Sequence, residues 1–168
     1  MQRSKIDFSD KTLSDADLIS LYGKLLTELK RREIIRTKNI VGELGEGFAI
    51  DHYTNMKNLR NLSAALPGTK NIDAEDEQGK RYAIKSTSGK TTGTFHGLLN
   101  DKSDEQPEQL FEYLLIVIFS ESYEVQFIYE LTWEQFLKHK KWHGRMKAWY
   151  VPVNNAVKND ARTVYPAG

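Results

Sequence analysis

The segment Tyr113–Phe119, with the sequence YLLIVIF, most constrains the fold because it is apolar along its whole length. It is far too short to cross a bilayer, which takes roughly 20 apolar residues as a helix. A short run rich in Ile, Val and Phe is typical of a strand inside a sheet. We therefore predict a central strand over 112–120.

Patterns on either side of this strand predict the other elements. The sequence SDAD at 14–17 is similar to a capping box, and apolar residues repeat after it at helical spacing. Asn39 is the expected N-cap of a second helix. The predicted helices cover 14–36, 39–53 and 132–139, and the further predicted strands cover 72–75, 81–86, 123–131 and 147–153. This order predicts an α/β or α+β domain around one mixed sheet.

Length and composition are those of one globular domain. The chain has 168 residues, of which 39% are hydrophobic and 28% are charged. We predict one domain over 1–168, in which the polar residues 1–11 are loosely held. Cysteine is absent, which excludes disulfides and thiolate metal sites. The first residues lack the apolar core of a secretory signal, so we expect a cytoplasmic protein that does not enter a membrane.

An acidic stretch at 73–77 is followed by a glycine turn and by a strand that carries one lysine, Lys85. Side chains alternate between the faces of a strand, so a hairpin would place Asp73 beside Lys85. Glu43 and Glu46 are neighbours on one face of the preceding helix. Three glycines in that helix reduce its propensity and indicate close packing against the sheet. The pattern predicts two or three carboxylates and one ammonium group at one point.

Such a set suits metal-dependent hydrolysis of a phosphodiester bond. Carboxylate oxygens bind Mg²⁺, and the backbone carbonyl of Ile84 is a further candidate ligand. The metal would generate hydroxide and neutralise charge on the phosphate, while Lys85 would orient or deprotonate the attacking water. The alternative is a solvated acidic turn with the Lys85 ammonium group extended to the sheet edge.

The sequences GELGE at 42–46 and NIDAEDEQGKRYAIKS at 71–86 resemble the PD-(D/E)xK nuclease superfamily. This group includes many restriction endonucleases, Holliday-junction resolvases and repair nucleases. Its core order, α-β-β-β-α-β, matches the elements predicted over 39–153. The resemblance implies a restriction endonuclease-like fold with the helix over 14–36 as an N-terminal addition.

The same resemblance implies roles for particular residues. Asp73 matches the first acid of the family motif and Lys85 matches its lysine. Glu46 matches the glutamate of the preceding helix, with Glu43 as a second candidate. Together with the Ile84 carbonyl, these acids would bind Mg²⁺ or Mn²⁺. The implied activity is a restriction- or repair-type endonuclease that acts on DNA, expected to be double-stranded, as a homodimer.

One position departs from the family motif. The residue two before Lys85 is Ala83, where the family has Asp, Glu or Gln. The missing carboxylate moves to the helix in some members, while other members are inactive. The alternative function is therefore an inactive nuclease-fold module that binds nucleic acid or a protein partner. A third hypothesis, an unrelated α+β interaction domain, predicts that Glu46, Asp73 and Lys85 lie apart.

Two further segments are candidates for contact with nucleic acid, although the net charge of +1 neither favours nor excludes that partner. The loop at 86–97 offers Lys90 and Thr91 to a phosphate backbone and lacks the spacing of a phosphate-binding loop. The segment at 138–150 interleaves basic residues with two tryptophans. Its candidate phosphate ligands are Lys140, Lys141 and Arg145. The alternatives are a flexible connector and a solvated helix end.

Overall fold

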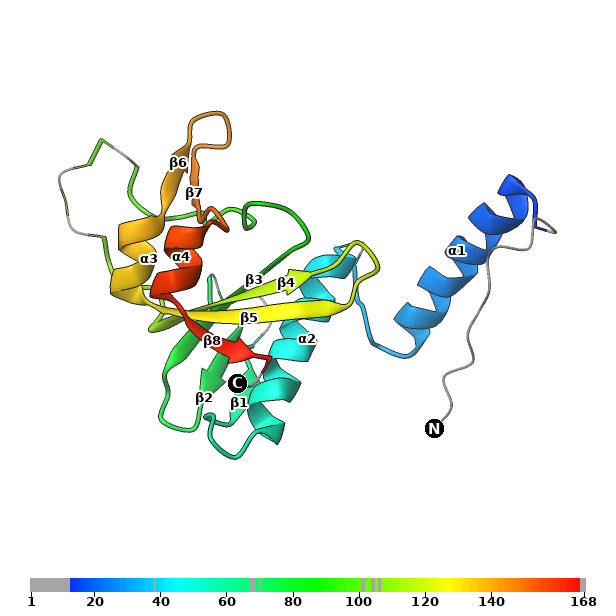
Figure 1. Cartoon of the computed structure of the whole chain (residues 1–168), viewed down its shortest axis with the longest axis horizontal. Coiled ribbons are helices and arrows are strands. Elements are labelled where there is room, and N and C mark those ends of the chain that lie inside the picture. Colours follow the sequence, from blue (N-terminus) through cyan, green and yellow to red (C-terminus); the bar gives the residue numbers. More distant parts are fainter. Residues whose placement is uncertain are drawn as a thin grey trace. The chain divides into compact units, whose positions relative to one another are not determined.

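A computed structural model describes residues 13–37, 39–66, 69, 71–100, 102–103, 105 and 107–166 (Figure 1). Contacts divide the chain into two units, Met1–Lys38 and Asn39–Gly168, and each is described by itself. The prediction of a single domain over 1–168 stays a prediction. The prediction for residues 1–11 lies outside the described residues.

The first unit contains helix α1, Asp15–Arg31. Its predicted capping box is confirmed: the Asp17 N–H donates to the Ser14 hydroxyl, and the Ser14 N–H donates to the Asp17 carboxylate at 3.0 Å. The helix ends before the predicted residue 36 because Glu33 adopts a left-handed backbone with φ 58°, which a right-handed helix cannot continue through. No residue of α1 is buried.

The second unit is built on a mixed sheet of six strands. Its strand order is β1-β2-β3-β4-β5-β8, in which β3 and β4 are parallel and the other neighbouring pairs are antiparallel. The strands are β1 Leu62–Ala64, β2 Ala74–Asp76, β3 Arg81–Thr87, β4 Tyr113–Phe119, β5 Val125–Thr132 and β8 Arg162–Tyr165. The predicted central strand is confirmed as β4, which lies between β3 and β5.

Helices cover both faces of this sheet (Figure 1), which explains why β4 is apolar on both sides. Helix α2, Ile40–Asn55, packs on the face that carries Tyr82 and Ile84. Helices α3, Trp133–His139, and α4, Asn155–Asp160, pack on the face that carries Ala83. The mixed α+β class predicted from the sequence is confirmed at this level.

The last predicted strand, 147–153, is wrong in extent and place. Only β7, Ala148–Tyr150, is a strand, and it pairs with β6, Lys141–His143, in a separate two-stranded sheet. The sixth strand of the main sheet is instead β8. The short edge strand β1 and helix α4 were not predicted from the sequence. Within the described ranges, no helix is long and apolar enough to span a bilayer.

Two contacts fix α2 against the sheet. The buried Tyr53 hydroxyl donates a 2.6 Å hydrogen bond to Glu130 of β5, and burial raises the pKa of Tyr53 above its usual range. Nearer the start of α2, Gly45 lies so close to β3 that a Cβ atom there would be 1.8 Å from the Ser86 hydroxyl. The prediction that glycine in this helix allows close packing against the sheet is thus confirmed at Gly45.

Candidate active site

Asp73 and Lys85 lie side by side at the start of β2, next to β3. Asp73 directly precedes β2, and its Oδ2 atom is 3.7 Å from the Lys85 Nζ atom. Both side chains keep about 20% of their surface exposed, so the pair is accessible to a solute. The predicted contact between these two residues is present. Their chemical roles stay predictions.

The site lies where β2 stops pairing with β3. The last paired residue is Ala74, opposite Tyr82. One step further, the Asp73 carboxylate accepts a 2.7 Å hydrogen bond from the Ile84 N–H. In a strand, the N–H and C=O of one residue point to the same side, so the Ile84 carbonyl also points toward Asp73. The Asp73 carboxylate therefore lies on the side of β3 to which the Ile84 carbonyl points.

The close contact between Gly45 and Ser86 brings α2 next to this part of β3, because Glu46 follows Gly45 and Lys85 precedes Ser86. The buried stripe of α2 contains Gly45, Ala49 and Tyr53. At about 100° per residue, Glu46 is about 60° from the middle of this stripe. Glu43 is about 120° away by the same geometry. Glu46 is therefore the better placed of the two predicted glutamates.

Lys85 and α2 are on opposite faces of the sheet. Lys85 shares its face with Ala83 and with Phe95, whose ring centroid is 5.4 Å from Nζ. Within the described ranges, no three His, Asp or Glu side chains form a group able to hold a metal ion. The three-carboxylate version of the predicted cluster is therefore not present among those residues.

Ala83, the departure from the family motif, has no exposed surface and packs in an apolar cluster with Phe111 and Leu114. A carboxylate at this position would place a charge in the core at a high free-energy cost. Position 83 therefore supplies no metal ligand in this chain.

Sequence reasoning missed Phe95, which supports the Lys85 ammonium group through a cation–π contact. Phe95 is fully buried in a segment that the sequence analysis treated as a loop. Its backbone N–H donates to the Trp149 carbonyl at 2.7 Å. No local pattern could have indicated it, because the contact joins residues that are far apart in the chain.

The predicted phosphate ligands fall on two connected segments. The Lys90 carbonyl accepts a hydrogen bond from the Val153 N–H at 2.8 Å, and Thr91 forms a β-bridge with Pro152. The loop at 86–97 is therefore tied to the segment after β7. At Lys90 and Thr91, therefore, the loop is not the flexible connector that was considered as an alternative.

Lys140, Lys141 and Arg145 lie on and beside the hairpin formed by β6 and β7. The prediction that α3 ends by residue 139 is confirmed. Of the solvated helix end considered for 138–150, only Lys138 and His139 lie in α3, and the chain then continues into β6. Lys140 lies with its Nζ atom 3.6 Å from the centroid of the Trp149 ring, and desolvation lowers the pKa of Lys140.

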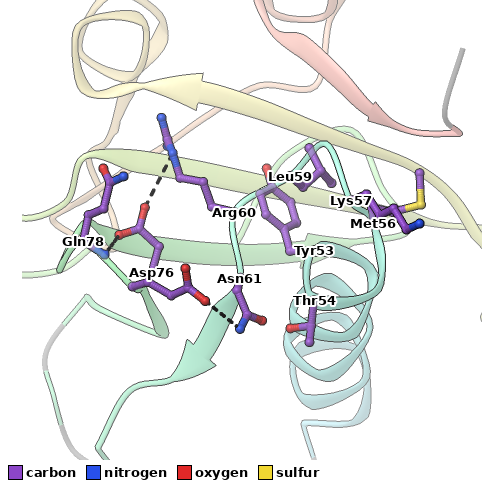
Figure 2. A pocket seen from close by; sticks show the side chains of 10 residues that line it. Tyr53, Thr54, Met56, Lys57, Leu59, Arg60, Asn61, Asp76 and Gln78 are labelled. Atoms are coloured by element: carbon purple, nitrogen blue, oxygen red, sulfur yellow. Dashed lines mark hydrogen bonds and ion pairs between the residues drawn. The ribbon is translucent and has the colours of Figure 1, made fainter.

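A pocket of about 380 Å³ lies beyond the C-terminal end of α2, and none of the predicted site residues lines it (Figure 2). Its buried acidic side chain is Asp76, which is 1% exposed. Asp76 Oδ1 accepts hydrogen bonds from the N–H groups of Gln78 and Lys80, both at 2.9 Å. Asp76 Oδ2 lies 3.6 Å from the Arg60 Nε atom.

The partners of Arg60 are aromatic as well as acidic. Its guanidinium donates to the Tyr82 hydroxyl at 2.8 Å and lies 4.6 Å from the centroid of the Tyr113 ring. Burial raises the pKa of Tyr82 to about 12, so this phenol stays neutral at physiological pH. The charges of Asp76 and Arg60 are thus paired with each other, which indicates a structural role for both residues.

No protein-family model matches this chain, and no curated protein matches it significantly.

Proposed function

We propose that this chain is a metal-dependent endonuclease that hydrolyses phosphodiester bonds of DNA, with a core of the PD-(D/E)xK type. The observation that carries the proposal is the Asp73–Lys85 pair beside the Ile84 backbone at the open edge of β3. A carboxylate, a carbonyl and an ammonium group together can bind a hard cation and a phosphate. The restriction- or repair-type role and the cytoplasmic location stay predictions.

The oxygen donors at this edge fit Mg²⁺ or Mn²⁺. Asp73 uses Oδ2 to accept from the Ile84 N–H, which orients the carboxylate toward the side where the Ile84 carbonyl points. Asp73, that carbonyl and Glu46 would hold the ion, with Glu43 as the less well placed substitute. When bound, such an ion supplies a nucleophilic hydroxide and neutralises charge on the phosphate.

Lys85 would act on the substrate. Its ammonium group is held between the Asp73 carboxylate and the Phe95 ring, so its position is set before a substrate arrives. From there it can donate to a phosphate oxygen or to the attacking water. Its partial exposure leaves room for that contact.

The test is cleavage of supercoiled plasmid DNA by the purified chain. We expect nicked and then linear DNA with Mg²⁺ or Mn²⁺, and no cleavage with EDTA. The same reactions with Asp73→Asn, which keeps the side-chain shape but removes the charge, control for a contaminating nuclease. Absence of cleavage with both ions in the parent chain would reject catalysis.

The alternative function is an inactive nuclease-fold module that binds nucleic acid or a protein partner. Burial of Ala83 in the apolar core favours it, because the second acid of the motif is missing. Calorimetry separates the two: an active site of the proposed kind binds Mn²⁺, and Asp73→Asn abolishes that binding. An inactive module binds neither ion tightly.

We also propose that the chain forms a homodimer through α1. The helix exposes Leu18, Tyr22 and Leu25 along one side, at the spacing of a coiled-coil seam that Leu29 continues. Its first turn is acidic and its last turn is basic. A second α1 in antiparallel orientation would place the acidic end of each helix against the basic end of its partner. Two subunits would also suit cleavage of both strands of a twofold-symmetric site.

Replacing Leu25 with aspartate is expected to convert the dimer into a monomer, because the substitution buries a charge in the centre of the apolar seam. Size-exclusion chromatography with light scattering measures the mass. Ser20→Asp adds the same charge to the opposite side of α1 and should leave the dimer intact. A monomeric parent chain at all accessible concentrations would reject the dimer.

A further inference from the structure

The β6–β7 hairpin is a small ribbon that projects beyond α3 and α4 (Figure 1). Its strands pair Lys141 with Tyr150 and Trp142 with Trp149. In the turn, the Met146 N–H donates to His143 Nδ1 at 3.2 Å. Such internal contacts hold the hairpin in shape before any partner binds.

The hairpin carries an uncompensated positive charge. Its cations are Lys140, Lys141, Arg145 and Lys147, and no Asp or Glu occurs anywhere in 135–159. None of the four forms an ion pair within the described part of the chain, whereas Lys138 is paired with Asp160 at 2.9 Å. A concentration of like charge on one projecting element attracts a polyanion.

The aromatic residues of the hairpin are engaged in its own packing. Trp149 is covered on one face by Lys140, and its Nε1–H donates to the Leu99 carbonyl at 2.6 Å. The Trp142 ring lies edge-on to Trp149, with 5.2 Å between the centroids. Binding of single strands relies on aromatic rings that are free to stack on bases, so these contacts favour a double-stranded partner.

The base of the hairpin is joined to the candidate active site. Phe95 and Trp149 exchange backbone hydrogen bonds of 2.7 and 3.2 Å, and the Phe95 ring contacts Lys85. A polyanion bound along the hairpin would therefore pass close to the Asp73–Lys85 pair.

We propose that the β6–β7 hairpin is a two-stranded ribbon that docks on double-stranded DNA, with Lys141, Arg145 and Lys147 against its phosphates. A β-ribbon has the width of the major groove. The identification of the polyanion as DNA rests on the proposed function. To that function this inference adds that the DNA is double-stranded and that the β6–β7 hairpin binds it.

Binding is measured by fluorescence anisotropy with a labelled 20-base-pair duplex, on the Lys85→Ala chain in EDTA so that no cleavage occurs. The variant Lys141→Gln/Arg145→Gln/Lys147→Gln is compared with its parent over a salt series. Because each phosphate contact contributes about 0.9 to the slope of log K against log salt, we expect the slope to fall by about 2 to 3. Affinity at about 0.1 M salt should fall at least roughly tenfold.

The matched control is Lys57→Gln/Lys80→Gln/Lys102→Gln, which removes the same charge from exposed lysines elsewhere on the second unit and should retain most of the affinity. Equal losses in the two triple variants would overturn the assignment to the hairpin. Tighter binding to the corresponding single strand than to the duplex would overturn the double-stranded partner. Both results are independent of cleavage, so a failure of the hairpin proposal can be told apart from a failure of the proposed catalysis.

Discussion

Replacing Lys85 with alanine is expected to abolish metal-dependent cleavage of plasmid DNA, with a loss of about a thousandfold or more in rate. The ammonium group is the one cation that contacts Asp73 in the described part of the chain, and it is positioned by Phe95. Its removal takes away the donor that would stabilise charge on the phosphate. Initial rates of plasmid nicking at saturating Mn²⁺ measure the effect.

Lys80→Ala is the matched control, because Lys80 is an exposed lysine just before β3. It should cleave at nearly the parental rate. Thermal unfolding of Lys85→Ala should match that of the parent within a few degrees, and duplex binding should persist. If Lys85→Ala still cleaves in a metal-dependent manner, the assignment of the site is wrong even when the chain proves to be a nuclease.

Replacing Asp76 with alanine is expected to lower the free energy of unfolding by about 2 to 4 kcal/mol. The substitution removes two hydrogen bonds that close the turn between β2 and β3. It also leaves the Arg60 guanidinium without its carboxylate partner. Urea denaturation followed by circular dichroism measures the change.

Glu77→Ala serves as the control for this substitution. Glu77 is the next residue and is exposed, with a single 3.0 Å hydrogen bond from Asn61. Its replacement should change the free energy of unfolding by no more than about 0.5 kcal/mol. A similarly small change for Asp76→Ala would show that the pocket charges contribute little to stability, contrary to the structural role inferred for them.

The elements that could be predicted from the sequence are those with strong local signals. The Ser14 and Thr132 capping boxes and the Asn39 cap define the starts of α1, α3 and α2, because a cap depends on residues within one turn. Strands β3, β4 and β5 were predicted within a few residues. The edge strand β8 was missed because four residues, RTVY, are too short for alternation to be recognised.

The contacts of the candidate site and of the pocket also fall into two kinds, those that a local pattern predicts and those that it does not. Alternation along a hairpin was enough to predict that Asp73 and Lys85 meet, since Asp73 lies just before β2 and Lys85 lies in the neighbouring strand β3. The contact of Phe95 with Lys85 and the pairing of Asp76 with Arg60 depend on segments that only the tertiary fold brings together. Of the four carboxylates in 73–77, the sequence analysis could not single out Asp76 as the buried one. The burial of Asp76 depends on its packing against β1 and the segment after α2, which are distant from it in the sequence.

The approach of Gly45 to Ser86 limits how this protein can diverge in sequence. A Cβ atom at position 45 would overlap the Ser86 hydroxyl and lie 2.7 Å from its Cβ atom, so alanine at position 45 becomes tolerable only when residue 86 is glycine. The two positions should therefore vary together in any lineage that keeps α2 against β3. Drift at this pair would alter the spacing between Glu46 and Lys85, and so would affect the proposed catalysis as well as packing.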